Sequence, residues 1–309
     1  MRQALSIILL LVALTCHAGD TLTLADPTIL LDGDTYYLYG TSSDKGFICY
    51  TSTDLEHWQG PAGVNGGFCL KKGDAWGDKG FWAPQVIKKG NVYYMFYVAN
   101  EQLAVATSNS PLGPFTNSTR AQIPAKQKEI DPFVFHDTDG KWYMYHDRLI
   151  DGNKIYVAEL NEDFSSMHDE TARLCVEAEA SEHWENTVKA SWPVCEGATV
   201  VKVGNRYHLF YSCNDFRNPD YAVGTATADK PTGPWRKSKY NPLISRKDTG
   251  INGTGHGDIF RDKEGQWRYV LHTHHDNTTV SPRRTAIVTL KYKGGRFHLV
   301  KNSFRYLTK

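Results

Sequence analysis

Five copies of one short pattern run along the chain from residue 22 to the C-terminus, and they constrain the fold more than any other feature. Each copy has an opening motif, a short apolar run, a turn containing glycine, and an alternating run rich in aromatic residues. Residues 130–147 show the pattern most clearly, because their Asp-Gly turn joins two strand-like runs, the strongest short-range signal of a β-hairpin. The opening motifs begin at Asp26, Ala83, Asp131, Glu196 and His256.

A repeat of roughly 50–65 residues that carries four strands is typical of a β-propeller blade. Third strands are expected at Phe47–Thr51, Leu103–Thr107, Lys154–Leu160, Tyr221–Thr227 and Thr285–Tyr292. Weaker fourth strands are expected around Trp58, Phe115, Arg173–Val176, Trp235 and Arg296–Val300. The sequence therefore predicts an all-β fold, a five-bladed β-propeller with four antiparallel strands per blade, as a single domain over residues 19–309. A β-sandwich is the alternative, but it would not explain five aligned openings.

Residues 161–194 interrupt the repeat between the third and fourth copies. This segment is rich in Glu and Asp, and we expect it to form a polar surface insertion. The first 18 residues have the features of a secretory signal peptide, with Arg2 before an apolar run at residues 5–14 and Ala18 at a cleavage-like site. That run is shorter than the ~20 residues that span a bilayer, so no transmembrane span is predicted. We expect a secreted or periplasmic protein; an outer-surface lipoprotein anchored through Cys16 is the alternative.

Charge and cysteine content exclude some classes of function. The chain has 35 Lys and Arg against 34 Asp and Glu, a net charge of +1, so nothing favours binding to nucleic acid or to an anionic membrane. No Cys-x-x-Cys pair is present, which makes zinc or redox chemistry at cysteine unexpected. An odd number of cysteines follows residue 18, and their pairing stays open: Cys49, Cys69, Cys175, Cys195 and Cys213.

In a propeller the first strand of every blade lines the central axis, so residues that open successive blades converge in space. Three of the five opening residues are acids, Asp26, Asp131 and Glu196, and a fourth is His256. Neighbouring carboxylates repel each other and raise at least one pKa, so such a ring indicates a functional site. Turn capping would explain one such acid but not three at matched positions. Two carboxyls of different pKa with a third that tunes them suit the cleavage of a glycosidic bond.

The opening motifs resemble those of glycoside hydrolase family 43, in the same order and over essentially the whole mature chain: Ala25-Asp26-Pro27, Phe81-Trp82-Ala83-Pro84, Ile130-Asp131-Pro132, Cys195-Glu196-Gly197 and Gly255-His256-Gly257. The resemblance implies an inverting mechanism, with Asp26 as the general base and Glu196 as the general acid. Asp131 would hold Glu196 in position and raise its pKa. Inversion predicts carboxyls of Asp26 and Glu196 roughly 6.5–9.5 Å apart, whereas a retaining enzyme would use Asp26 as a nucleophile at about 5–5.5 Å.

Several further residues are expected to bind substrate. Trp82 precedes the second opening and can stack on a sugar ring, and Phe81 and Trp76 are weaker candidates on the same loop. The resemblance implies one arginine facing the acids. Alternation along a strand allows only one of Arg283 and Arg284 to do so, and we favour Arg283.

The resemblance also places His256 near a water or a Ca²⁺ ion in the central channel, with hydrogen bonding to the acids as the alternative. Any such ion would be ligated mostly by water, and no cofactor is expected to be required. His272 and His274 would share a strand face, but nothing in the spacing completes a zinc site, so we expect pocket or strand-end histidines.

These observations lead to one functional hypothesis. It is a secreted, inverting exo-glycoside hydrolase that removes terminal α-L-arabinofuranosyl or β-D-xylosyl residues from plant cell-wall polysaccharides or oligosaccharides. An endo-arabinanase or a galactan-active member of the same family is the first alternative. A carbohydrate-binding propeller without turnover is the alternative of another class.

Overall fold

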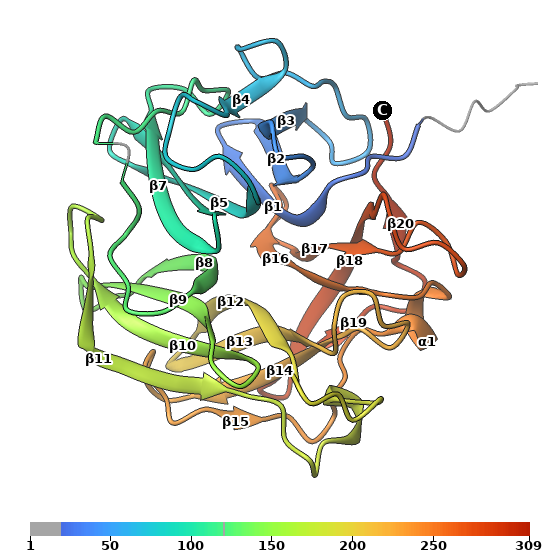
Figure 1. The fold of residues 1–309 in the computed structure, drawn as a ribbon. Helices are drawn as coiled ribbons and strands as arrows, with labels where there is room; N and C mark the ends of the chain where they lie inside the picture. The colour runs from blue at the N-terminus through green and yellow to red at the C-terminus, as the bar shows by residue number, and fades with distance from the viewer. Residues whose placement is uncertain (1–19, 120) are drawn as a thin grey trace, which may run out of the picture.

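The structure is a computed structural model that describes residues 20–119 and 121–309. Five small antiparallel sheets form a ring, so the predicted five-bladed β-propeller is confirmed (Figure 1). The first strands surround the centre of the ring: β1 (Ala25–Asp32), β5 (Trp82–Lys89), β8 (Glu129–His136), β12 (Cys195–Val203) and β16 (Gly255–Arg261). The predicted signal peptide, residues 1–18, and Cys16 lie outside the described residues.

The remaining strands follow outward in each blade. Blade 1 adds β2 (Thr35–Thr41), β3 (Gly46–Ser52) and β4 (Phe68–Lys71), and blade 2 adds β6 (Val92–Ala99) and β7 (Gln102–Ser108). Blade 3 adds β9 (Trp142–Leu149), β10 (Asn153–Leu160) and β11 (Met167–Val176). Blade 4 adds β13 (Arg206–Cys213), β14 (Ala222–Ala228) and β15 (Arg236–Lys237). Blade 5 adds β17 (Trp267–Thr273), β18 (Arg284–Lys293), β19 (Arg296–Leu299) and β20 (Arg305–Tyr306).

Two blades depart from the predicted four strands. Blade 2 has three strands, because the segment at Phe115 makes only an isolated bridge and its N–H donates to the Cys69 carbonyl of blade 1 at 2.7 Å. Blade 5 has five strands, because β20 also pairs with β18. In blade 1 the fourth strand is β4 and not the segment at Trp58, whose N–H donates to the carbonyl of Thr308.

The two ends of the described chain close the ring in blade 5. The Leu22 N–H donates to the Leu307 carbonyl at 2.8 Å, and the Thr285 N–H donates to the Leu22 carbonyl at 2.8 Å. Because β20 lies just before Leu307 and pairs with β18, residues from both ends of the chain join the same sheet.

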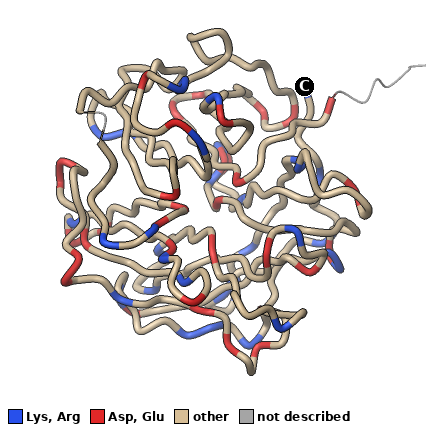
Figure 2. The backbone as a smooth tube through the Cα atoms, viewed as in Figure 1, with Lys and Arg blue, Asp and Glu red and all other residues tan. Residues whose placement is uncertain are grey.

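Apolar residues pack between neighbouring blades. Alternation along the second and third strands turns one set of side chains toward each neighbouring sheet. Between blades 1 and 2, for example, Tyr39, Phe47, Phe81 and Tyr97 are fully buried together. Acidic and basic residues are scattered around the whole ring (Figure 2).

The segment at residues 161–194 is only partly the surface insertion that was expected. Its first half contributes β11, a long edge strand of blade 3. Its second half contains the 3₁₀ turn η1 (His183–Glu185) and brings Trp192 to the cavity described below. The helix α1 (Arg246–Thr249) is a single turn, and no helix in residues 20–119 and 121–309 is long and apolar enough to cross a bilayer.

Every first strand carries a β-bulge at its opening motif, where the pairing register with the second strand shifts. One residue of each bulge has a positive φ: Asp26 (48°), Ala83 (41°), Asp131 (56°), Gly197 (65°) and His256 (38°). Side chains other than glycine rarely adopt this left-handed conformation, and when they do it is often next to active sites. We term these five residues the left-handed ring.

The left-handed ring corrects the sequence alignment in blade 4. Gly197, and not Glu196, is the equivalent of Asp26 and Asp131. Glu196 instead matches Trp82 and Ile130, each of which precedes the left-handed residue of its blade. The acid of blade 4 therefore enters the site from one position earlier along its strand than the acids of blades 1 and 3.

Candidate active site

A cavity of about 480 Å³, within the usual range for a ligand site, opens at the start of the first strands. We term it the mouth cavity. Residues of all five blades and of the segment before β12 line it: Asp26, Trp82, Glu101, Ile130, Asp131, Leu149, Asn153, Trp192, Val194, Glu196, Asp215, Phe216, Arg217, His256 and Arg283. Six of the eight candidate residues named from the sequence are among them, and Phe81 and Trp76 are not.

Phe81 is fully buried, so the expectation that it contacts substrate is wrong. Its ring centroid lies 5.9 Å from that of Phe47 and 6.1 Å from that of Tyr97, in the core between blades 1 and 2. Trp82, the next residue, points the other way and is 37% exposed in the mouth cavity. Neighbouring residues on an extended chain face opposite sides, and only one of the two can reach the cavity.

Asp26 is surrounded by positive charge and hydrogen-bond donors. Arg283 Nη1 lies 2.9 Å from Oδ1, and the Thr41 hydroxyl donates to Oδ2 at 2.7 Å. His256 and His272 each place Nδ1 within 3.4 Å of Oδ1. Burial by itself would raise the pKa of Asp26, but the charge of Arg283, with His256 beside it, outweighs this effect and holds the pKa well below its usual range. Asp26 is therefore a carboxylate at neutral pH.

Arg283, and not Arg284, faces the acids, which is the choice favoured from the sequence. The Arg283 guanidinium also lies 4.4 Å from the ring centroid of Phe216, which fixes its direction. Arg284 lies over the ring of Tyr306 instead, on the other side of the strand. Arg283 thus binds the Asp26 carboxylate from one wall of the mouth cavity.

Glu196 is held by two hydrogen-bond donors, one on each oxygen. The Tyr221 hydroxyl donates to Oε1 at 2.8 Å, and Asn153 Nδ2 donates to Oε2 at 2.9 Å. Burial raises the pKa of Glu196 to about 7, the negative charge of Asp131 adds to the rise, and His256 and the Tyr221 hydroxyl lower it. The preceding residue, Cys195, forms a disulfide with Cys213 of β13, which ties the start of β12 to its neighbour. Glu196 can therefore keep a proton near neutral pH.

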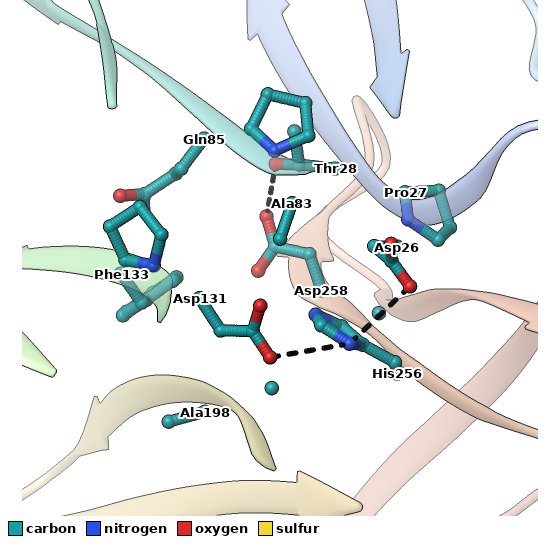
Figure 3. A pocket seen from close by; sticks show the side chains of 14 residues that line it. Asp26, Pro27, Thr28, Ala83, Gln85, Asp131, Phe133, Ala198, His256 and Asp258 are labelled. Atoms are coloured by element: carbon teal, nitrogen blue, oxygen red, sulfur yellow. Dashed lines mark hydrogen bonds and ion pairs between the residues drawn. The ribbon is translucent and has the colours of Figure 1, made fainter. Parts of the chain in front are cut away.

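Asp131 belongs to a cluster of three acids with buried Asp147 and half-buried Glu196, and one oxygen of each lies within 4.8 Å of the others. His256 Nδ1 lies between two of the predicted acids, 3.4 Å from Asp26 Oδ1 and 3.8 Å from Asp131 Oδ2 (Figure 3). The sequence analysis left two possibilities for His256, a position near a channel water or ion, or contact with the acids. The structure places its ring in contact with the acids. Asp147, at the end of β9, was not singled out from the sequence.

A second, narrower cavity of about 30 Å³ continues along the axis from Asp26, Asp131 and His256 to Asp258 (Figure 3). Both oxygens of Asp258 already accept hydrogen bonds, from Thr28 and Thr199 at 2.7 Å each. Calcium takes six to eight oxygen ligands, and both Asp258 oxygens are engaged, so waters would have to supply most of the ligands of any Ca²⁺ ion bound here.

The sequence analysis missed two further residues of the site, Asn153 and Trp192, and named His272 only as a pocket or strand-end histidine. His272 is fully buried and accepts the Asp26 N–H at 3.1 Å, while burial and the Arg283 charge lower its pKa to about 3, so its ring is neutral. Asn153 links Glu196 to Trp192, because its Oδ1 accepts the indole N–H at 2.9 Å. Only His272 carried a signal, as part of a histidine run, whereas the positions of Asn153 and Trp192 depend on loops.

The comparisons with known proteins agree with this geometry. The family model of glycosyl hydrolases family 43 matches residues 21–297. The solved structure of an endo-1,4-β-xylanase from Bacteroides thetaiotaomicron VPI-5482 is 36% identical, with a TM-score of 0.85, over 94% of this chain and 99% of that one.

Two characterised relatives match at lower identity. A β-D-galactofuranosidase of Aspergillus niger is 23% identical over 87% of this chain and 79% of its own length. A xylosidase/arabinosidase of Bacteroides ovatus is 28% identical over 64% of this chain and 65% of its own length. The family match spans nearly the whole propeller and includes all three acids. This chain belongs to glycoside hydrolase family 43.

Proposed function

We propose that this chain is a secreted, inverting exo-glycosidase that removes terminal α-L-arabinofuranosyl or β-D-xylosyl residues from plant cell-wall polysaccharides. One observation carries the proposal. Two carboxyls in one cavity have pKa values moved apart, because Arg283 and His256 overcome the effect of burial at Asp26, whereas burial raises the pKa of Glu196 to about 7. A deprotonated base and a protonated acid in one cavity are what glycosidic hydrolysis requires.

The proposed reaction is a single displacement. Glu196 donates its proton to the glycosidic oxygen as the bond from that oxygen to the anomeric carbon breaks. Asp26 accepts a proton from a water molecule, whose oxygen bonds to the anomeric carbon from the opposite face of the sugar. The products are a sugar of inverted configuration and a shortened chain, with Glu196 ionised and Asp26 protonated. Exchange of protons with solvent restores the starting state.

The three other predicted residues support this chemistry. Asp131 places negative charge beside Glu196 and so favours its protonated form. Arg283 keeps Asp26 ionised and fixes the direction of its carboxylate. His256 lies between Asp26 and Asp131 and lowers the pKa of both, which limits the repulsion between them. We propose no metal-dependent step, and dialysis against EDTA should leave the activity unchanged.

Two exposed indoles in the mouth cavity support a sugar-binding role. Trp82 is 37% exposed and Trp192 is 48% exposed, and an aromatic face can stack on the apolar face of a pyranose or furanose ring. Residues of every blade contribute to the wall of this cavity, which favours binding of a chain end and supports exo action.

An endo-acting xylanase or arabinanase is the second candidate. The solved relative with a TM-score of 0.85 is an endo-1,4-β-xylanase, and an Aspergillus oryzae relative is a probable arabinan endo-1,5-α-L-arabinosidase. Chromatography of the products from xylan and from linear arabinan separates the two candidates. Exo action releases single sugars from the first minutes, whereas endo action releases oligosaccharides first.

Secretion is part of the proposal. The Cys195–Cys213 disulfide supports an oxidising compartment, where such bonds persist. Mass spectrometry of protein recovered from the native host should give a chain that begins at Gly19. A diacylglyceryl group on Cys16 would support the lipoprotein alternative instead.

The test of activity uses aryl arabinofuranosides, aryl xylosides, xylan, arabinan and galactan with wild type and Glu196→Gln. The variant should lose at least about a hundredfold in kcat on polysaccharide, and less on dinitrophenyl glycosides, because that leaving group needs little protonation. Glu159→Gln, which removes the charge of a partly exposed acid paired with Lys141, is the matched control. Binding of oligosaccharide without hydrolysis by wild type would instead support a sugar-binding propeller.

A further inference from the structure

The five second strands share one position directly behind the bulges of the first strands. Each residue at this position pairs with the residue that precedes the left-handed ring. From blade 1 to blade 5 these residues are Thr41, Val98, Asp147, Ser212 and His272. Four are polar, and one of them, Asp147, is an acid that the catalytic proposal does not use.

In four blades this residue accepts a hydrogen bond from the left-handed residue of the next blade around the ring. The donors and acceptors are Ala83 N–H to Thr41 Oγ1 (2.9 Å), Gly197 N–H to Asp147 Oδ2 (3.3 Å), His256 N–H to Ser212 Oγ (2.8 Å) and Asp26 N–H to His272 Nδ1 (3.1 Å). Thr41 and Ser212 do this without any charge. The hydrogen bond between neighbouring blades therefore does not require an acid, and it does not explain why blade 3 has Asp147 at this position.

Blade 1 shows what the extra oxygen of Asp147 can do. Besides accepting from blade 2, the Thr41 hydroxyl donates to the carboxylate of Asp26 in its own blade at 2.7 Å. Asp147 has the same place relative to Asp131, because it pairs with Ile130, and oxygens of the two carboxyls lie within 4.8 Å of each other. A hydrogen bond between two carboxyls needs one proton between them.

The surroundings of Asp147 favour the protonated form. The side chain is fully buried, and no donor in the described part of the chain reaches Oδ1. The titratable groups that face it are Asp131 on β8, Glu196 on β12 and Cys175 on β11, none of them basic. His256 on β16 lies on Asp131, 3.8 Å from its Oδ2. An ionised Asp147 would leave a buried, unpaired charge beside two other acids.

We propose that Asp147 is a positioning residue that stays protonated and donates a hydrogen bond to Asp131, so that Asp131 keeps its negative charge beside Glu196. Burial and the neighbouring Asp131 raise the pKa of Asp147 well above its usual range. Burial also raises the pKa of Asp131, and a hydrogen bond from Asp147 opposes that rise. Asp147 therefore acts on the general acid through Asp131, as Thr41 acts on the base directly. The inference rests on the proposed roles of Asp131 and Glu196.

Two substitutions distinguish a role of Asp147 as a protonated hydrogen-bond donor from a role as a negative charge. Asp147→Asn keeps a donor for Asp131 and an acceptor for Gly197, and it should retain wild-type kcat and pH profile within about twofold. Asp147→Val introduces valine, the residue that blade 2 has at the equivalent position, Val98. This substitution removes both the donor to Asp131 and the acceptor for the Gly197 N–H. It should lower kcat about tenfold or more with KM little changed, because Asp147 does not line the mouth cavity. Asp131 would then protonate more readily, so the basic limb should move to lower pH.

Either of two kinetic results would overturn the proposal. If Asp147→Asn moves the basic limb down as far as Asp147→Val does, then Asp147 acts as a charge. If Asp147→Val keeps the wild-type kcat and profile, then Asp147 has no role in the reaction.

A spectroscopic test does not depend on activity or on the Val variant. Wild type minus Asp147→Asn infrared difference spectra near neutral pH should contain the carbonyl stretch of a protonated carboxyl, and absence of that band overturns the proposal. Asp137→Asn is the control, because Asp137 is another buried acid of blade 3, whose pKa is lowered by hydrogen bonds from Tyr207 and Lys202. If wild type hydrolyses no glycoside, the proposed function fails, but the infrared test still decides the protonation of Asp147.

Discussion

Asn153 donates a hydrogen bond of 2.9 Å from Nδ2 to Oε2 of Glu196. The other end of the same amide accepts the indole N–H of Trp192, a half-exposed residue of the mouth cavity. A side chain that can contact substrate is therefore linked through one amide to the proposed general acid.

Replacement of Asn153 by Ala should slow the reaction and move the basic limb of the pH profile upward. The amide stabilises the Glu196 carboxylate that forms after proton transfer, and a hydrogen bond to a charged group is worth about 1.5–3 kcal/mol, so kcat should fall about tenfold or more. Without this donor the pKa of Glu196 rises further, because the charged form loses a partner. Profiles of kcat against pH check both effects. Asn161→Ala, which removes an amide of a surface turn in blade 3, should match wild type.

Replacement of Arg283 by Ala should move the acid limb of the profile upward. Burial raises the pKa of Asp26 and Arg283 is the strongest group that opposes it, so the pKa rises when the guanidinium is removed. Activity needs ionised Asp26, is present above its pKa, and should therefore be lost at a higher pH as the solution is acidified. Arg284→Ala removes the same charge one residue away, over Tyr306, and should leave the limb in place. Equal shifts in the two variants would show a long-range charge effect in place of a contact.

Replacement of Asp131 by Asn should preserve the fold and lower kcat by about a hundredfold or more. The negative charge of Asp131 adds to the effect of burial in raising the pKa of Glu196, so removal of that charge lowers this pKa. The protonated acid then persists only to a lower pH, and the basic limb should move downward. Kinetics from acid to alkaline pH, with circular dichroism as the check on folding, tests this. An upward shift would contradict the assignment of Glu196 as the acid.

The Cys195–Cys213 disulfide should contribute measurably to stability. It closes a loop with a sequence separation of 18 residues, and the chain-entropy model assigns about 3 kcal/mol to a loop of this size. Cys195→Ala with Cys213→Ala should lower the free energy of unfolding by about that amount in chemical denaturation. Cys175→Ala, which removes a free cysteine, is the control. Thiol labelling of the oxidised protein, expressed from residue 20 onward, checks the pairing. Labels on Cys49, Cys69 and Cys175 alone would confirm it.

The repeat in the sequence was sufficient to predict the propeller and the convergence of Asp26, Asp131 and Glu196, because equivalent strands of a ring must meet at its axis. It was not sufficient for the register in blade 4. A β-bulge interrupts the two-residue period of a strand, and Cys195-Glu196-Gly197 gives no sign of which residue takes the left-handed conformation.

The errors and omissions have similar causes. Phe81 and Trp82 are adjacent aromatic residues, and the choice of which faces the cavity depends on packing between blades 1 and 2. Asp147 was part of the predicted hairpin, but its contact with Asp131 arises only when the bulge brings that residue back toward β9. Asn153 and Trp192 reach the site through a turn and a long segment, whose paths no periodicity predicts.

The most direct test of the account is the configuration of the first product. Proton NMR during hydrolysis of an aryl glycoside, recorded before mutarotation, shows which anomer of the released sugar forms first. The account predicts the anomer opposite to that of the substrate, since Asp26 activates water on the face opposite the bond that Glu196 protonates. A first-formed sugar of retained configuration would make Asp26 a nucleophile and would contradict the proposed mechanism.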